Sequence, residues 1–250
     1  NQLELLAAVA AANPNVVVLL SAGSSLESDW VKDCKALVYG CLGGQAGAGA
    51  LVEVLTGAQN PCGKLAETWA RSYADTPAKA HFGGDGPTVE YREGLYVGYR
   101  YYDTAGVPTA FPFGYGLSYT TFEQSITGYH DSGDTISVDV TVTNTGDMAG
   151  KSVVQLYAQT PYGDYERQHG VEKSAIQLAG FGKTQELAPG ASETVTITVD
   201  KYLLASYDTT AHDGAGGYIL SDGDYYLAIG EDSHLSHIHI SEPTRHSLIS

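Results

Sequence analysis

The stretch that decides the fold is Phe111-Pro112-Phe113-Gly114-Tyr115-Gly116-Leu117-Ser118-Tyr119-Thr120-Thr121-Phe122. It combines aromatic rings, glycines and a proline in a run that fits neither a helix nor a regular strand. Glycine supplies backbone angles that other residues avoid, and buried rings supply rigid packing. The stretch therefore predicts a rigid connector between two structural units.

The residues before this connector predict the end of an α/β sandwich. Leu3 to Ala12 has apolar residues at helical spacing, and Asn13-Pro14-Asn15 stops it because proline and its predecessor both resist helix. Val16 to Leu20 is a short β-branched run, typical of a strand buried on both faces of a parallel sheet, and Leu37 to Tyr39 is a candidate second strand. Gln45 to Leu55 predicts the next helix. The alternation indicates an α/β architecture, of which about the last third is present.

The residues after the connector predict an all-β domain. Ile136, Val138, Val140 and Val142 alternate strictly with polar residues, which is the period of a half-buried strand. Further short strands are expected at residues 153–158, 176–187, 194–199 and 218–229, with turn signals between them. This rhythm is typical of an immunoglobulin or fibronectin III-like sandwich. We divide the chain into an α/β portion (1–82), an aromatic hinge (83–122), a β-sandwich (123–235) and a tail (236–250).

The tail does not fit either unit. Four of the eight histidines follow residue 233, in a segment that begins Ser236-His237-Ile238-His239-Ile240. The segment resembles a translated sequencing-library adapter joined to a truncated gene, so we leave residues 236–250 out of the predicted fold as non-native. The competing interpretation is a metal-binding histidine cluster, which no cysteine or well-spaced acidic residue completes.

Composition excludes several classes of partner. The chain has 250 residues and a formal net charge of -16, with 29 acidic and 13 basic residues. Nucleic acids and anionic membrane surfaces attract clustered Lys and Arg, so neither is an expected partner. The sequence contains no apolar run of about 18 residues that would span a membrane.

The lone Met148 indicates a fragment or a processed product. The three cysteines, Cys34, Cys41 and Cys62, are predicted to be free thiols.

Several motifs, in the same order along the chain, resemble those of glycoside hydrolase family 3. The resemblance covers the first helix to about residue 235, with Gly43 in place of a usual proline and Cys62 in place of a usual serine. The motifs are Gly43-Gly44-Gln45-Ala46-Gly47, Asn60-Pro61-Cys62-Gly63-Lys64-Leu65, Tyr91-Arg92-Glu93-Gly94, Gly98-Tyr99-Arg100-Tyr101-Tyr102-Asp103, Val154-Gln155-Leu156-Tyr157 and Gly223-Asp224-Tyr225-Tyr226-Leu227.

This resemblance implies that the connector is the hinge between an α/β-sandwich domain and a fibronectin III-like domain. It implies a β-glucosidase type of enzyme acting on a carbohydrate substrate, with a TIM-like barrel domain that is missing here and no cofactor. Retaining glycosidases need two carboxyl groups about 5 Å apart. The family places its nucleophilic Asp on the barrel, and many members place the acid/base Glu before the helix that opens this chain. We therefore assign no catalytic residue.

Ser28-Asp29-Trp30 has the letters of the family's nucleophile motif. It follows a strand of the α/β sandwich rather than a barrel strand, so we interpret Ser28 or Asp29 as the cap of a helical turn. Glu53 is expected on a solvated helix face, and Glu90 and Glu93 in ion pairs with Arg92 or Arg100. His81 and Asp85 lie in or beside a glycine-rich loop that could approach a sugar, although most such loops are only turns. The isolated histidines are expected as solvated side chains in turns, with no metal role assigned: His130, His169 and His212.

Two alternatives stay open. A stand-alone carbohydrate-binding or adhesion module needs a row of exposed aromatic rings on the sandwich, and affinity gels with soluble glucans would detect it. A gene product without function is the second alternative, and the uncovered apolar strand edges of a partial α/β unit predict poor solubility. The candidate rings for the binding module are Tyr157, Tyr162, Tyr165, Tyr225 and Tyr226.

Overall fold

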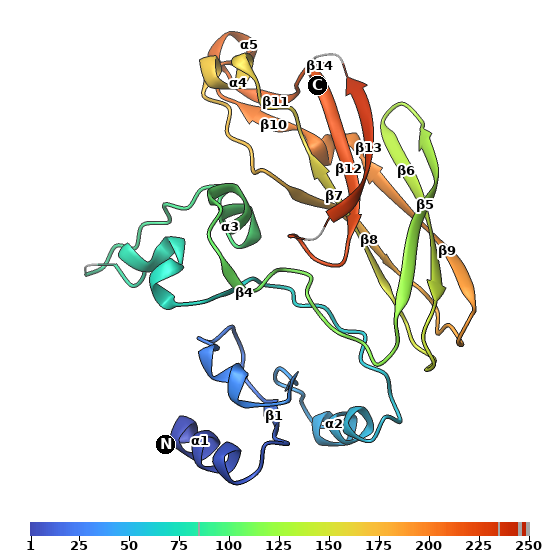
Figure 1. Cartoon of the computed structure of the whole chain (residues 1–250). Helices are drawn as coiled ribbons and strands as arrows, with labels where there is room; N and C mark the ends of the chain where they lie inside the picture. Colours follow the sequence, from blue (N-terminus) through green and yellow to red (C-terminus); the bar gives the residue numbers. More distant parts are fainter. Residues whose placement is uncertain (85, 235, 245–246, 249–250) are drawn as a thin grey trace.

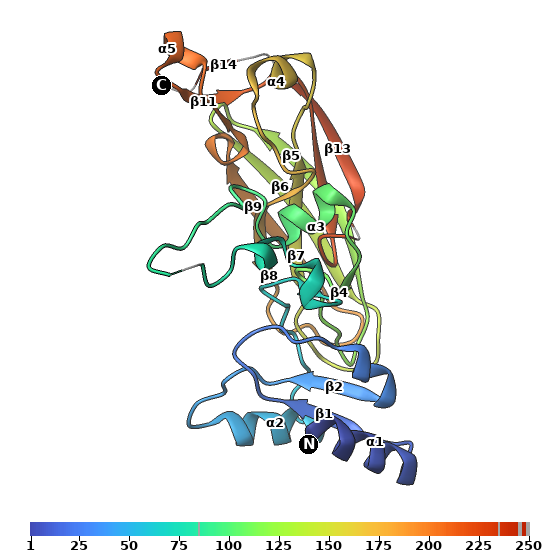
Figure 2. The ribbon, with the colours of Figure 1, turned by 90° about the vertical axis from the view of Figure 1, so that its left-hand side faces the viewer.

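The computed structural model describes residues 1–84, 86–234, 236–244 and 247–248. A small unit of helices and strands lies at one end of the molecule, and a β-sandwich extends from it (Figure 1). The view turned by 90° shows the same separation, with the green connecting segment between the two units (Figure 2). The expected order, an α/β unit followed by a β-sandwich, is confirmed.

The N-terminal unit contains the helices and strands that the sequence predicts. Helix α1 (Gln2–Ala12) ends at Asn13, and strand β1 (Val17–Leu20) pairs in parallel with β2 (Ala36–Tyr39). Helix α2 (Gly47–Leu55) follows. Parallel pairing requires a crossover, and the segment between β1 and β2 provides it.

The expected burial of this unit is wrong. Val17 and Leu19 of β1 are exposed, and α1 has no buried residue. A parallel strand is buried only when layers cover both faces of its sheet, and the described residues do not supply those layers. Apolar side chains are therefore left on the surface of this unit: Leu3, Leu5, Leu19, Leu42, Val52 and Leu55.

The hinge contains more regular structure than the sequence predicts. Strand β3 (Trp69–Ala70) pairs with β4 (Thr109–Phe111), which ties the hinge to the end of the α/β portion. The buried ring of Trp69 contacts the ring of Phe111 edge-on, with 5.7 Å between centroids. Between these strands lie the short 3-10 helices η2 (Tyr73–Asp75) and η3 (Pro77–Ala80) and helix α3 (Tyr99–Ala105).

The sandwich consists of two facing sheets. One has the order β5-β6-β9 and the other β13-β12-β7-β8, with β13 spanning Ser236–Thr244. The alternation predicted for β6 is confirmed, since its residues alternate between buried and half-buried positions along the whole strand. Apolar side chains from both sheets form the core. The strands are β5 (Phe122–Asp131), β6 (Thr135–Asn144), β7 (Val153–Gln159), β8 (Gln177–Lys183), β9 (Ser192–Asp200) and β12 (Gly223–Gly230).

A smaller group of elements covers the end of the sandwich away from α1 and α2 (Figures 1 and 2). Strands β10 (Ser206–Asp208) and β11 (Gly217–Leu220) pair there, next to the buried side chains of Val171 and Ala211. The helical elements of this region are α4 (Asp164–His169), η4 (Lys201–Leu204) and α5 (Ala211–Gly214).

Leaving the tail out of the fold is wrong for part of it. Strand β13 (Ser236–Thr244) pairs antiparallel with β12, and β14 (Ser247–Leu248) pairs with β11. The edge of β12 presents backbone groups that any extended segment satisfies by pairing, and residues 237–240 alternate as a strand does. The non-native origin of residues 236–250 stays a prediction.

Candidate functional site

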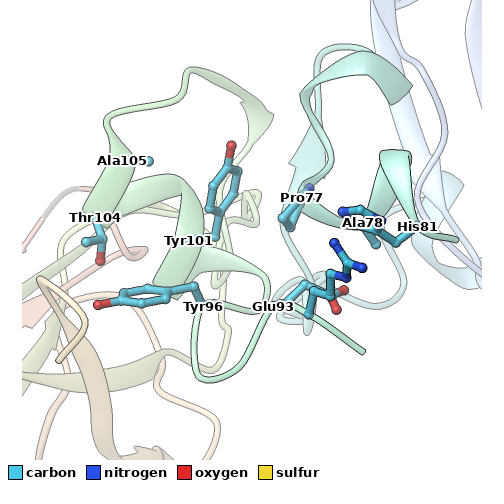
Figure 3. A pocket seen from close by; sticks show the side chains of 9 residues that line it. Pro77, Ala78, His81, Glu93, Tyr96, Tyr101, Thr104 and Ala105 are labelled. Atoms are coloured by element: carbon cyan, nitrogen blue, oxygen red, sulfur yellow. The ribbon is translucent and has the colours of Figure 1, made fainter. Parts of the chain in front are cut away.

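Two cavities adjoin the hinge, and the larger, of about 460 Å³, lies where the hinge meets residues 77–81 of the α/β portion. Its walls come from three segments: η3 with His81, the loop from Arg92 to Tyr96, and α3 (Figure 3). The rings of Tyr96 and Tyr101 form one side, and Pro77, Ala78 and His81 lie across from them. The cavity therefore combines aromatic faces with a few polar groups, as small-molecule sites do.

Glu93 is the one carboxylate among the described residues that line this cavity. Arg92 also lines it and is paired with the carboxylate of Glu90. Burial, followed by the charge of Glu172, raises the pKa of Tyr96, so its hydroxyl stays protonated. A retaining glycosidase uses two carboxyl groups on either side of the bond it cleaves, and this arrangement offers one.

The cavity walls are attached to the β-sandwich by long-range hydrogen bonds. The backbone N–H of Ala175 donates to Thr104 Oγ1 over 2.8 Å, and that of Leu178 donates to the hydroxyl of Tyr99 over 2.8 Å. The ring of Tyr99 stacks on Phe113, with 4.7 Å between centroids. Helix α3 is therefore fixed to the sandwich on one side and lines the cavity on the other.

The connector itself is held by a buried network around Gly114. Gln155 Nε2 donates to the carbonyl of Gly114 over 3.1 Å, and the hydroxyl of Tyr157 donates to Gln155 Oε1 over 2.8 Å. Gly114 has φ +84, and a Cβ there would lie 2.0 Å from Gln155 Oε1. Only glycine fits this backbone angle and this close approach. The prediction of a rigid connector with an unusual backbone angle is confirmed at this position.

A second brace comes from the turn at residues 60–65. Asn60 Oδ1 accepts hydrogen bonds from the hydroxyl of Ser118 and the backbone N–H of Tyr119, and its Nδ2 donates to the carbonyl of Ala149. Lys64 Nζ donates to the carbonyl of Gly116 over 2.7 Å. One turn of the α/β portion thereby holds both the connector and the loop between β6 and β7 of the sandwich.

The smaller cavity, of about 230 Å³, lies where α3 meets the end of β12. Asp103 on its wall is nearly buried and is paired with His234. Burial raises the pKa of Asp103, although the charge of His234 opposes the shift. Asp103 is the one carboxylate among the described residues that line this cavity, so it also lacks a second acid.

Three residues considered from the sequence, His81, Arg92 and Glu93, line the larger cavity together, and the other described ones lie apart from it. Asp29 is exposed and begins the 3-10 helix η1 (Asp29–Asp33). Ser28 occupies the N-cap position, as expected, but its side chain makes no capping hydrogen bond. Glu53 is exposed on α2, and the ion pair of Glu90 with Arg92 is confirmed. Asp85 lies outside the described residues.

The expectation that the isolated histidines lie in turns is wrong for His130 and His169, and His212 lies within the short element α5 with non-helical backbone angles. His130 lies in β5, 3.4 Å from Asp139, and His169 ends α4, where its ring stacks on Tyr165. His130 and His169 lie at or near the ends of their elements, next to the turn residues at 131–134 and Gly170, which explains the error. The three cysteines are free thiols, as expected. Among the described residues no group of three His, Cys, Asp or Glu side chains is placed to hold a metal ion.

The five candidate tyrosines do not form the row of exposed rings that a binding module needs. Tyr225 is buried in the core of the sandwich, whereas Tyr157 is buried on the opposite face of β7, where its ring meets that of Tyr99. Tyr162 and Tyr226 are exposed, and Tyr165 is half-buried. The sequence also did not indicate the cavity residues Tyr96, Tyr101 and Thr104 as one site; the density of tyrosine between residues 91 and 102 was the available signal.

The fold defines a class of protein: an α/β unit joined by a rigid aromatic connector to a fibronectin III-like sandwich, as in multidomain glycoside hydrolases. Residues 1–119 match the family model of the glycosyl hydrolase family 3 C-terminal domain, and residues 152–233 match that of the fibronectin type III-like domain. The chain belongs to glycosyl hydrolase family 3.

Individual relatives agree with the family models. The chain is 43% identical over 237 residues to thermostable β-glucosidase B of Acetivibrio thermocellus, and 39% identical over 234 residues to an exo-α-(1->6)-L-arabinopyranosidase of Bifidobacterium breve. Each match covers 93% of this chain and 30% of the relative. The chain thus spans less than a third of the length of these curated relatives.

Solved structures show the same likeness. The β-glucosidase of Kluyveromyces marxianus in complex with glucose superposes with a TM-score of 0.90 at 34% identity, covering 99% of this chain and 29% of that one. β-Glucosidase 3B of Thermotoga neapolitana in complex with α-D-glucose gives a TM-score of 0.90 at 34% identity, covering 99% and 34%. The arrangement of α/β unit, hinge and sandwich is therefore shared with these enzymes.

Proposed function

We propose that this chain is the bracing portion of a β-glucosidase-type glycoside hydrolase, and that the catalytic carboxylates belong to sequence outside it. The observation that carries the proposal is the network that fixes Gly114 to Gln155 and Asn60 to Ala149, which makes one body of the α/β unit and the sandwich. The two cavities beside the hinge, in contrast, are each lined by one carboxylate. Rigid support without an acid pair fits a scaffold.

The proposed partner of the scaffold is the remainder of a longer enzyme. We propose that the exposed apolar side chains of α1, β1 and α2 pack against the rest of the α/β domain, and that a TIM-like barrel adjoins it. Leu3, Leu19 and Val52 are the kind of side chains that gain roughly 1.5–3 kcal/mol each when they are buried. The substrate of the whole enzyme is proposed to be a β-glucoside.

The test is a chimera. Replacing the matching 237 residues of the Acetivibrio thermocellus β-glucosidase with this chain restores a full-length protein around the brace. We expect the chimera to hydrolyse an aryl β-glucoside. A soluble, folded chimera that leaves the aryl glucoside intact would contradict the proposal.

The aryl α-L-arabinopyranoside is assayed in parallel, because another relative bears that activity in its name. If the chimera hydrolyses the arabinoside and not the glucoside, the scaffold role is supported and the proposed β-glucoside substrate is wrong.

A further inference from the structure

Three tyrosines from three different elements meet on the surface of the sandwich. Tyr202 lies in η4, Tyr207 in β10 and Tyr218 in β11, and their side chains are 46%, 50% and 43% exposed. The centroid of the Tyr218 ring is 5.1 Å from that of Tyr202 and 5.3 Å from that of Tyr207. We call these three residues the tyrosine cluster. Single exposed rings are ordinary, but exposed rings that contact one another form a surface of their own.

The cluster is held in place without a ligand. Tyr207 and Tyr218 are direct cross-strand partners of the antiparallel pair β10–β11, so their rings stand side by side on the outer face. The hydroxyl of Tyr207 lies against Gly216, where a Cβ would be 2.3 Å away. Tyrosine has few rotatable bonds, so a preformed group of three rings loses little entropy when it binds.

The tyrosine cluster lies far from the apolar surface through which the scaffold is proposed to contact the rest of the enzyme. In both views β10 and β11 lie at one end of the sandwich, and α1 and α2, with their exposed apolar side chains, lie at the opposite end of the molecule (Figures 1 and 2). A partner that completes the α/β unit would therefore bind far from these rings.

The size and charge of the cluster restrict its partner. Three tyrosines at about half exposure offer roughly 300 Å² of surface. A stable protein partner needs about 800 Å² on each side, so the cluster alone is too small for one. The net charge of -16 disfavours anionic ligands, and each ring combines an apolar face with a hydroxyl. A neutral ligand with both apolar faces and hydroxyl groups fits, and sugar rings have this chemistry.

The angles between the rings restrict the partner further. The ring planes of Tyr202 and Tyr218 are inclined at 56°, and those of Tyr207 and Tyr218 at 73°. The surface is therefore faceted rather than planar, and a flat crystalline face would contact only one ring at a time. A single dissolved chain bends and follows the facets. We propose that the tyrosine cluster binds a soluble, neutral glucan chain, independently of the proposed hydrolytic role.

Affinity electrophoresis of the 250-residue chain in gels containing soluble mixed-linkage β-glucan tests the proposal. We expect the glucan to retard the chain, and Tyr207→Ala and Tyr218→Ala each to weaken binding about tenfold, which is about 1.4 kcal/mol. Tyr218→Phe keeps the ring and should keep most of the retardation. Tyr162→Ala is the matched control, because Tyr162 is 53% exposed on the same domain outside the cluster. Unfolding curves of the variants show whether the alanine variants are folded.

Four results would overturn the proposal. They are an unretarded wild-type chain, an equal loss in Tyr162→Ala, tighter retention on microcrystalline cellulose than on the soluble glucan, and a glucan-independent dimer that Tyr218→Ala dissociates. The last result would assign the cluster to a protein contact. Because the readout is binding, failure here leaves the chimera assay of hydrolysis unaffected, and the reverse also holds.

Discussion

Asn60 and Ala149 are 89 residues apart in sequence, and Asn60 Nδ2 donates a hydrogen bond of 3.1 Å to the carbonyl of Ala149. The amide oxygen of the same side chain accepts from Ser118 and Tyr119. One side chain thus bonds the connector and the sandwich from a turn of the α/β portion. These bonds join the α/β portion, the connector and the sandwich through one residue.

Replacing Asn60 by alanine removes three hydrogen bonds at once. At about 1 kcal/mol each, we expect a loss of about 3 kcal/mol in the free energy of unfolding. Urea unfolding followed by tryptophan fluorescence measures it, because the buried Trp69 reports on the hinge. Gln59→Ala, at an exposed neighbouring position, should change the free energy by less than about 0.5 kcal/mol. Equal effects of the two variants would show that Asn60 is not a brace.

A comparison of Gly114→Ala with Gly133→Ala separates the free-energy cost of steric contact from that of backbone strain. Gly114 and Gly133 both have positive φ, but a Cβ at Gly133 meets open space, whereas one at Gly114 meets Gln155 and Tyr157. We expect Gly133→Ala to cost about 1 kcal/mol of unfolding free energy and Gly114→Ala to cost at least about 3 kcal/mol. Chemical denaturation of both variants gives the comparison, and a difference near zero would argue against the close packing of the connector.

The sequence predicts those elements whose pattern is regular. Strand β6 alternates without interruption from Ile136 to Val142, and this regular pattern located it. Strand β5 was not predicted, because a bulge between Ile126 and Gly128 breaks its alternation. Helix α3 was missed because its tyrosines are weak helix formers, and the contacts of Tyr99 with Phe113 and Leu178 that hold it come from distant residues.

The buried ion pair of Glu166 and Lys173 should matter far more than a surface pair. Its atoms are 3.0 Å apart with side chains only 3% and 4% exposed, and Lys173 also donates to Ser221. Lys173→Met leaves a buried carboxylate uncompensated, and we expect a loss of about 3–5 kcal/mol in unfolding free energy. Arg167→Ala, which breaks the exposed pair with Asp164, should cost at most about 1 kcal/mol. Similar thermal midpoints for the two variants would refute this ranking.

The lowered pKa of the Glu166 carboxylate predicts that the free energy of unfolding depends on pH. Burial alone would raise the pKa of Glu166, but hydrogen bonds from Ser221, the Gly163 backbone and Lys173 outweigh it and lower the pKa from 4.5 to about 2. A lowered pKa stabilises the folded state above pH 4.5, and this contribution is lost as the pH falls toward 2. Glu166→Gln should therefore be less stable than the wild type at pH 7, with a gap that narrows below pH 4.5. A gap that stays constant between pH 7 and 2.5 would contradict the assignment.

The candidate site was less predictable than the fold. The sequence predicts an aromatic hinge at residues 83–122, and within it Tyr99 meets Tyr157 of the sandwich edge-on. The cavity also needs η3 and α3, neither of which the local pattern indicates. The tyrosine cluster joins residues 202, 207 and 218 through the pairing of β10 with β11, and short strands of three or four residues carry too little periodicity to be recognised.

The most direct test of the account is the turnover of an aryl β-glucoside by the purified 250-residue chain, with Glu93→Gln beside it. We predict no hydrolysis above the buffer blank for either protein, since Glu93 is the one carboxylate lining the larger described cavity. Steady turnover that the Glu93→Gln exchange abolishes would place catalysis within this chain and contradict the scaffold role.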